Sequence, residues 1–273
     1  MSPTRAAGTP TRSAERGAEH VAEVLRSEFC KFRSVRSTIW TLIAAVAGNV
    51  VLAALAAIFI PPHLSAHEQA TTDPIRLSLA GLHLSQIAFG VLGVLVIGSE
   101  YGTGLIRATF AAVPQRRLVL AGKAIVFAAT ALAVGIASCF VAYAIFGAFL
   151  SGDALRSSIG DPGVIRAITG GGLYLAVLGL LGLGLGAILR SSTAAIATLF
   201  GLLFVPSVLV SLLPQSWHST VGPYIPMEAG SQIFVATRHD PNSLGAWTGL
   251  GVFSLYASAA LIVGFALVNH RDT

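Results

Sequence analysis

The sequence has 273 residues, of which 54% are hydrophobic and only 11% are charged. A soluble domain typically carries about 25% charged residues, so this chain has too little charge to cover a surface that faces water. The formal net charge is +5, and its placement along the chain indicates membrane topology rather than nucleic-acid binding.

The chain begins with two segments of different character. Residues 1–19 are rich in small and polar side chains without hydrophobic periodicity, which predicts a disordered cytosolic tail. Over residues 20–36, apolar residues recur every three or four positions and basic residues lie between them, which predicts an amphipathic helix in the membrane interface. The apolar positions are Val21, Leu25, Phe29, Phe32 and Val35, and the charged ones are Arg26, Glu28, Lys31, Arg33 and Arg36.

Six apolar runs follow this basic segment. A helix needs about 20 apolar residues to cross the ~30 Å hydrocarbon core of a bilayer, and each run reaches or nearly reaches that length. The sequence therefore predicts an all-α integral membrane protein whose transmembrane domain covers residues 20–273. The runs are 38–60, 79–97, 124–150, 167–189, 194–213 and 244–268.

The loops between the runs set the expected orientation. If the N-terminus is cytosolic, 13 of the 17 Lys and Arg residues fall on the cytosolic side and 4 on the outer side. Cytosolic loops carry the excess of Lys and Arg in membrane proteins. We therefore expect both termini in the cytosol, which an even number of spans requires.

Signatures of stand-alone chemistry are missing from the sequence. It contains no GxxxxGK[ST] phosphate loop, no HExxH zinc motif, no GxSxG nucleophile elbow and no metal-ligand spacing. No Asp, Glu, Lys or Arg lies in the central part of any apolar run, whereas ion-coupled carriers usually need ionisable residues there. We expect a chain that is not an enzyme and binds no cofactor itself.

Several residues inside the runs allow two interpretations. His83 and Gln86, in the outer part of the second run, are candidates for a substrate path, although such residues more often bond to a neighbouring helix. In the fourth run, Gly182 and Gly186 form a small-xxx-small pair that lets two helices approach closely. That approach serves packing within the subunit or, as the alternative, a dimer interface.

The connection after the second run has a readable pattern. Glu100 ends the span, Gly102 frees the backbone to turn, and Thr103 is a candidate N-cap for a short helix that Pro114 ends. This predicts an amphipathic helix on the cytosolic face, covered by lipid or by a groove on a partner. Its apolar face consists of Ile106, Thr109, Phe110 and Val113.

These segments carry a family resemblance. The basic segment that runs into the first span, the Glu-Tyr-Gly-Thr-Gly connection and the Pro-rich stretch between the fifth and sixth spans resemble, in this order and spacing, the permease subunits of ABC-2 type (type V) ABC exporters, particularly the actinobacterial kind. The residues that carry the resemblance are Arg26–Trp40, Glu100–Arg107 with Pro114, Arg116 and Lys123, and Leu213–Trp217 with Tyr224–Gly230 and the C-terminal His270–Asp272.

The resemblance implies a bacterial plasma-membrane subunit that pairs with a second permease subunit, either as a homodimer or as a heterodimer with a similar chain. Cytosolic ABC ATPase subunits, which bind ATP and Mg²⁺, would dock on an N-terminal elbow helix and on a coupling helix between spans 2 and 3. Short re-entrant helices would lie between spans 5 and 6. The elbow residues are Glu28, Lys31, Arg33 and Arg36; Glu100, Gly102, Thr103 and Arg107 would shape the coupling segment, and Ile106 and Phe110 would form its docking face.

On this interpretation the substrate moves outward, and its identity is not encoded in any motif. The apolar spans favour an amphipathic substrate. Two alternatives remain open at the level of sequence. One is a non-transporting membrane scaffold or regulatory subunit, which would have much the same sequence, and the other is an ion-coupled carrier.

Overall fold

The computed structural model describes residues 10–106, 116–150, 152, 155–212, 214–236 and 242–270. Within these ranges the chain is helical and contains no strand. Seven helices have 20 or more residues: α1 (Pro10–Ser34), α2 (Arg36–Phe59), α5 (Leu82–Thr103), α7 (Arg116–Phe149), α8 (Val164–Leu189), α9 (Ser192–Ser211) and α12 (Ala246–His270).

Six of these helices, from α2 to α12, are long and apolar enough to cross a membrane. The prediction of an all-helical chain with six helices long and apolar enough to cross a membrane is therefore confirmed. Two boundaries differ from the prediction by more than three residues: α5 continues to Thr103 instead of ending at residue 97, and α7 begins at Arg116 instead of residue 124. In both places the helix continues into polar sequence, where hydropathy no longer marks it.

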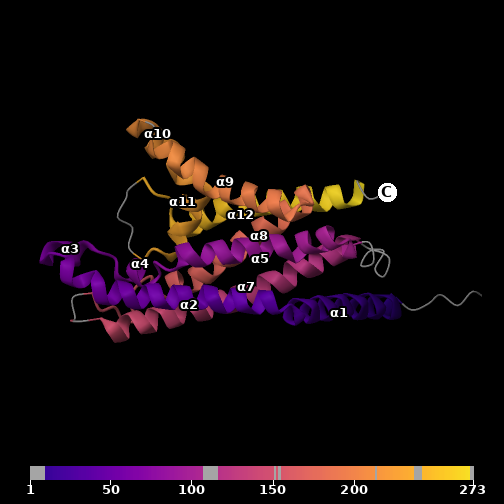
Figure 1. Cartoon of the computed structure of the whole chain (residues 1–273), viewed down its shortest axis with the longest axis horizontal. Helices are drawn as coiled ribbons and strands as arrows, with labels where there is room; N and C mark the ends of the chain where they lie inside the picture. The colour runs from indigo at the N-terminus through magenta and orange to yellow at the C-terminus, as the bar shows by residue number, and fades with distance from the viewer. Residues whose placement is uncertain are drawn as a thin grey trace, which may run out of the picture.

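The glycine-rich helix α8 lies at the centre of the bundle. Its spanning window is 67% buried, compared with 28% for α2 and 22% for α9. It packs against α5, α7 and α12 (Figure 1). The exposed sides of the outer helices carry large apolar residues, such as Trp40 on α2 and Leu255 on α12, as expected of surfaces that face lipid.

The glycines of α8 allow these close contacts. A β-carbon on Gly93 of α5 would lie 2.0 Å from the carbonyl oxygen of Gly179, and one on Gly182 would lie 2.6 Å from the carbonyl oxygen of Gly90. A β-carbon on Gly186 would lie 2.9 Å from Ile97. The small-xxx-small pair therefore faces α5 of the same chain, which is the intramolecular interpretation of that pattern.

The bundle has two distinct ends, which we name the α1 end and the α3 end. Helix α1, the last turn of α5 and the last turn of α12 lie at the α1 end, while the short helices gather at the α3 end or just inside it (Figure 1). The short elements are η1 (Pro61–His63), α3 (Ala66–Thr71), α4 (Pro74–Ser78), α10 (Gln215–Val221), η2 (Gly222–Tyr224), α11 (Pro226–Ser231) and η3 (Gln232–Phe234).

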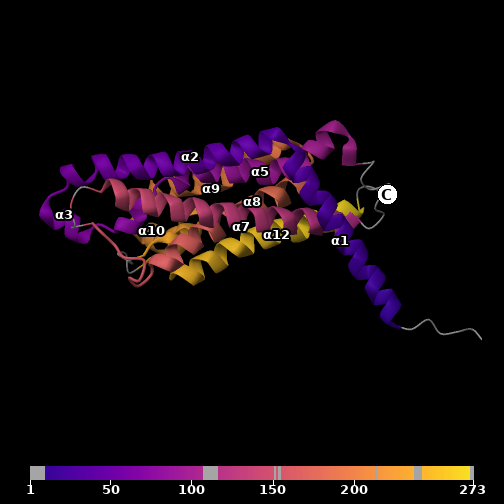
Figure 2. The ribbon, with the colours of Figure 1, turned by 90° about the horizontal axis from the view of Figure 1, so that it is seen from below.

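Helix α1 leaves the bundle at a steep angle, as Figure 2 shows from a second direction. Val35, with φ −81° and ψ 104°, is extended and separates α1 from α2. Helix α1 begins at Pro10, so it includes residues 10–19, for which the sequence predicted no regular structure. Its crossing angle is compatible with a helix that lies along a membrane surface.

Candidate functional site

Four charged side chains from three helices meet at the α1 end, and we call them the ionic cluster. The Nζ of Lys123 on α7 donates to Oε2 of Glu28 on α1 at 2.7 Å and to Oε1 of Glu100 on α5 at 2.6 Å. The Nζ of Lys31 on α1 lies 2.8 Å from Oε1 of Glu28 and 3.7 Å from Oε1 of Glu100. The cluster thereby joins α1 to the last turn of α5 and to the N-terminal part of α7.

Most of the ionic cluster is buried. The side chains of Lys123, Glu28 and Glu100 are 3%, 6% and 12% exposed, whereas Lys31 is 47% exposed. Removing one member of a buried ion pair typically costs about 3–5 kcal/mol, because it leaves the other charge buried without compensation. Each of these three helices is thus held in place by the charges on the other two.

The pKa of Lys31 reflects this surrounding. Burial lowers it, but the hydrogen bond to Glu28 and the charges of Glu28 and Glu100 more than offset burial, so the pKa of Lys31 lies above its ordinary value. A raised lysine pKa contributes stability that is present below the ordinary pKa and is lost only as the pH rises through the folded-state pKa. Lys31 therefore keeps its charge across the physiological range.

Apolar contacts support the cluster from the α1 side. Val24 is buried, and a β-carbon on Gly122 of α7 would lie 3.0 Å from it. One turn beyond the charges, the rings of Phe32 and Phe127 meet edge to face with centroids 6.2 Å apart. The absence of a side chain at Gly122 lets α1 cross α7 closely enough for Glu28 to reach Lys123.

The turn after α5 differs from the prediction. Gly102 lies inside α5 with open space around it, and Thr103 is the last residue of α5, where its hydroxyl donates to the carbonyl oxygen of Ser99. The predicted turn at Gly102 and N-cap at Thr103 are therefore wrong. Gly104 makes the turn instead, with φ 73°, a left-handed conformation that glycine adopts without penalty.

The docking face predicted from the coupling segment is described only in part. Ile106 is 8% exposed and Leu105 is 58% exposed, so Leu105, and not Ile106, presents apolar surface there. The predicted residues Arg107 and Phe110 lie outside the described residues. Of the other elbow residues, Arg33 and Arg36 are exposed.

A second contact joins the end of α5 to the α8–α9 connection. The guanidinium carbon of Arg190 lies 5.4 Å from the ring centroid of Tyr101, a cation–π contact. Arg190 ends α8 with φ 53°. The Glu-Tyr pair at 100–101 therefore connects α5 to α1 and α7 through its carboxylate and to α8 through its ring.

The two candidates for a substrate path lie elsewhere. Gln86 is buried, and its Oε1 accepts a 2.5 Å hydrogen bond from the hydroxyl of Tyr174 on α8. Gln86 therefore bonds to a neighbouring helix, which is the alternative to a role in a substrate path. His83 lies at the start of α5, with its ring 6.1 Å from that of Phe234.

The short helices near the α3 end are fixed by a polar contact that we call the Asp73–Ala236 link. Asp73 Oδ1 caps α4 by accepting from the backbone nitrogens of Ile75 and Arg76, and its Oδ2 accepts from the nitrogen of Ala236 at 2.9 Å. Arg166 at the start of α8 donates to the carbonyl oxygens of Val235 and Ala236. The end of η3 is thus held from both sides.

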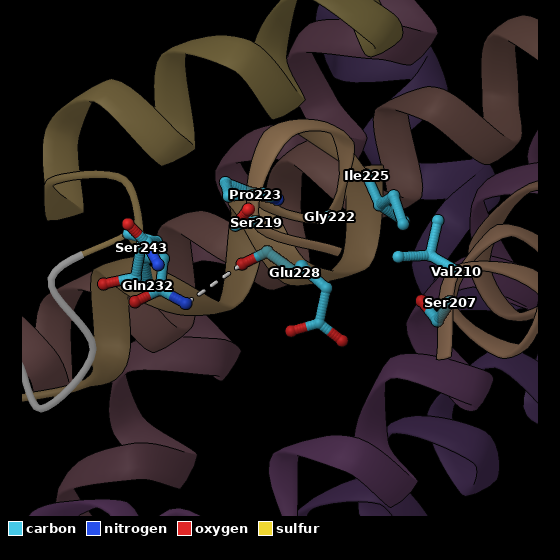
Figure 3. A pocket seen from close by; sticks show the side chains of 10 residues that line it. Ser207, Val210, Ser219, Gly222, Pro223, Ile225, Glu228, Gln232 and Ser243 are labelled. Atoms are coloured by element: carbon cyan, nitrogen blue, oxygen red, sulfur yellow. Dashed lines mark hydrogen bonds between the residues drawn. The ribbon is translucent and has the colours of Figure 1, made fainter. Parts of the chain in front are cut away.

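A polar pocket of about 410 Å³ opens beside these short helices. Glu228 of α11 projects its carboxylate into it, between Ser207 and Val210 on one side and Gln232 on the other (Figure 3). The Nε2 of Gln232 donates to the backbone oxygen of Glu228 at 3.4 Å. Within the described residues, no group of His, Cys, Asp and Glu side chains is suited to hold a metal ion.

No protein-family model matches the chain, and no curated protein matches it.

Lys123 is the residue of the ionic cluster whose partners the sequence did not predict. It belongs, with Pro114 and Arg116, to the stretch that resembles a coupling segment, where it was interpreted only as a basic residue that returns the chain to the membrane surface. A lysine followed by a long apolar run reads as a membrane-interface anchor, and only the crossing of α1 over α7 makes it the partner of two carboxylates.

Proposed function

We propose that the chain is the membrane-spanning permease subunit of an ATP-binding cassette exporter in a bacterial plasma membrane. It would pair with a second permease subunit and move an amphipathic substrate outward. Separate cytosolic ATPase subunits would bind and hydrolyse ATP with Mg²⁺. The chain itself would contribute no catalytic residue.

The ionic cluster is the observation that supports this proposal best. An exporter whose ATPases are separate proteins must pass their motion to the spans through a stiff cytosolic contact. Lys123 hydrogen-bonds to Glu28 and Glu100 at 2.7 and 2.6 Å, so a push on α1 is passed to the ends of α5 and α7. Such a joint would suit force transmission, because breaking buried charge pairs is costly.

The distribution of polar groups also favours an ATP-driven exporter over an ion-coupled carrier. The charges of the ionic cluster lie at the α1 end, and in the spans the buried polar residues Asn49, Ser85 and Gln86 are uncharged. A carrier driven by protons or sodium would need ionisable groups at membrane depth. A non-transporting scaffold is the remaining alternative. The experiments below distinguish it from an exporter.

The first experiment is to tag the chain, extract it gently from its native membrane and identify what co-purifies. A stoichiometric ABC ATPase would support the proposal, and reproducible purification without one would contradict it. Because a scaffold could also bind an ATPase, the complex is then reconstituted in vesicles. ATP hydrolysis that depends on the permease, together with outward transport, distinguishes the exporter.

A variant tests the role of the ionic cluster in coupling. We expect Glu100→Ala to insert and assemble with the ATPase but to hydrolyse ATP without proportionate transport. Glu68→Ala serves as the control, since Glu68 is an exposed carboxylate at the α3 end. If Glu100→Ala transports as much substrate per ATP hydrolysed as the wild type, the ionic cluster has no role in coupling.

A further inference from the structure

A groove opens between α2 and α5 at the α1 end. Farther along the bundle the two helices touch, because the hydroxyl of Ser85 donates to the carbonyl oxygen of Ala45 at 2.9 Å and a β-carbon on Gly48 would lie 3.0 Å from Leu84. Toward α1 they separate around a groove of about 450 Å³. That volume lies within the range of about 300–1,000 Å³ typical of small-molecule sites.

The walls of the groove are largely apolar. One face of α5 contributes Leu92, Leu95 and Val96 at i, i+3 and i+4 spacing, and Phe32 of α1 lines the side near the charges. The wall formed by α2 carries small hydroxyl side chains, among them Thr41, whose hydroxyl already donates to the carbonyl oxygen of Ser37. Such walls suit an acyl chain better than a hydrated solute.

The ionic cluster forms the polar end of the groove, and one of its carboxylate oxygens has no hydrogen-bond donor. Oε1 of Glu100 accepts from Lys123, but Oε2 of Glu100 is buried and has no hydrogen-bond partner in the described part of the chain. A buried acceptor without a donor costs about 1–3 kcal/mol, and more when it is charged. Glu100, which lines the groove, therefore has a buried carboxylate oxygen that lacks a hydrogen-bond donor.

The charges of the cluster narrow the chemistry of that donor. Glu28 and Glu100 balance Lys31 and Lys123, so a guest headgroup without net charge keeps the site neutral. A headgroup that is only anionic would be repelled by the open oxygen of Glu100. A quaternary ammonium has no N–H to donate, whereas a primary ammonium does. Lys31 is 47% exposed, and its remaining N–H groups can receive a phosphate beside the ammonium.

We infer that the groove is a binding site for one phospholipid with a primary-ammonium headgroup, of the phosphatidylethanolamine type. Its ammonium donates to Oε2 of Glu100, its phosphate lies against Lys31, and one acyl chain follows Leu92, Leu95 and Val96. The groove adjoins lipid-facing side chains of α2 such as Ile39 and Ile43, which are 42% and 50% exposed. The bilayer thus supplies the ligand directly.

The lipid is a resident component of the fold on this inference and not a transported substrate. It fills the space between α2 and α5 and completes the hydrogen bonding of the ionic cluster. The inference therefore does not depend on the proposed transport function, and its test needs neither an ATPase nor ATP.

The test is native mass spectrometry of the full chain, stripped of lipid in detergent and titrated with defined lipids. We expect one phosphatidylethanolamine to bind per chain, about tenfold more tightly than phosphatidylcholine or phosphatidylglycerol of the same acyl composition, as for one charge-assisted hydrogen bond. Equal binding of the three lipids would overturn the inference.

Variants locate the site. Ser99→Phe places a ring in the groove and should abolish the binding of phosphatidylethanolamine in the same titration. Ser258→Phe is the matched control, because Ser258 is an exposed serine on α12. This variant should bind phosphatidylethanolamine as tightly as the wild type. If Ser99→Phe does not fold, Leu95→Trp fills the same groove from a side chain that is 37% exposed. Retention of the lipid in a folded groove-filling variant would overturn the inference.

Glu100→Gln tests the headgroup contact. The amide keeps the shape of the side chain but removes the charge that attracts an ammonium. We expect the roughly tenfold preference for phosphatidylethanolamine over phosphatidylcholine to disappear, so that the two lipids bind about equally. A preference that is unchanged in Glu100→Gln would show that Oε2 of Glu100 is not the ammonium acceptor.

Discussion

The Nζ of Lys123 lies 2.7 Å from Oε2 of Glu28, although the two residues are 95 positions apart. Both side chains are buried, and they belong to helices that run in different directions, one along the bundle and one across its end (Figure 2). This contact sets the place where α1 crosses α7. It also makes the attachment of α1 depend on buried charges.

The first prediction concerns that attachment. Lys123→Met leaves Glu28 and Glu100 buried without their shared partner, and we expect the free energy of unfolding to fall by about 3–5 kcal/mol. Helix α1 should loosen before the bundle does, because the other contacts that hold it are few. Thermal unfolding in detergent measures the first effect, and limited trypsin cleavage at the basic residues of α1 measures the second.

Arg26→Met is the control for Lys123→Met. Arg26 is an exposed cation on α1 outside the ionic cluster, so the same change of side chain should leave stability within about 0.5 kcal/mol. Equal destabilisation by the two variants would mean that the ionic cluster does not hold α1.

The six spans were predictable because burial in lipid and burial in protein both select apolar side chains, so hydropathy alone marks helices such as α8 and α12. The ends were less predictable. Hydropathy stops at residue 97, but α5 continues to Thr103 because its backbone hydrogen bonds continue through polar residues. Gly102 and Gly104 look alike in sequence, and only the structure shows that Gly104 takes the left-handed conformation.

The ionic cluster was predictable only in part. Glu28 and Glu100 stood out because each is an acidic residue in a segment that carries a resemblance. Lys123 also belongs to such a segment, but its partners were not predictable, because they lie 95 and 23 positions away and no local pattern encodes a crossing between helices. The same holds for Asp73, whose link to Ala236 joins two loops that are 163 positions apart.

The second prediction concerns the Asp73–Ala236 link. Asp73→Ala removes the cap of α4 and leaves the nitrogen of Ala236 without its acceptor, and we expect a loss of about 1–2 kcal/mol. The amide of Ala236 should exchange with deuterium markedly faster than in the wild type. Hydrogen exchange read by mass spectrometry of the segment that contains η3 measures this.

Asp161→Ala is the matched control for that exchange experiment. Its Oδ2 accepts from the backbone nitrogen of Ser158, so it caps a local turn and joins no distant segments. It should leave exchange in η3 unchanged. If Asp73→Ala and Asp161→Ala gave the same exchange there, the link would have no role in holding η3.

The third prediction concerns the hydrogen bond between Tyr174 and Gln86. Tyr174→Phe keeps the ring stacked on Phe253, with centroids 5.3 Å apart, but leaves the amide of Gln86 without its donor. We expect a loss of about 1 kcal/mol, in the range found for hydrogen bonds between helices in membranes. A double-mutant cycle with Gln86→Leu should show a non-additive term, since one bond cannot be lost twice. Additive losses would deny the bond any energetic role.

The fourth prediction concerns the contact between α5 and α8. In Gly93→Ala the new β-carbon would lie 2.0 Å from the carbonyl oxygen of Gly179, so the two helices must move apart. Overpacking of this kind typically costs about 1–3 kcal/mol, which outweighs the gain of up to about 1 kcal/mol that alanine brings to a helix interior. Thermal unfolding in detergent should show Gly93→Ala to be less stable than the wild type.

Gly147→Ala gives the comparison that separates packing from helix propensity. Gly147 lies in α7, and a β-carbon there would meet nothing within 4 Å. The same substitution should therefore leave stability unchanged or raise it by a few tenths of a kcal/mol. Opposite signs for the two variants would establish that glycine is required in α5 for its approach to α8. A Gly93→Ala variant as stable as Gly147→Ala would mean that α5 and α8 tolerate a wider separation.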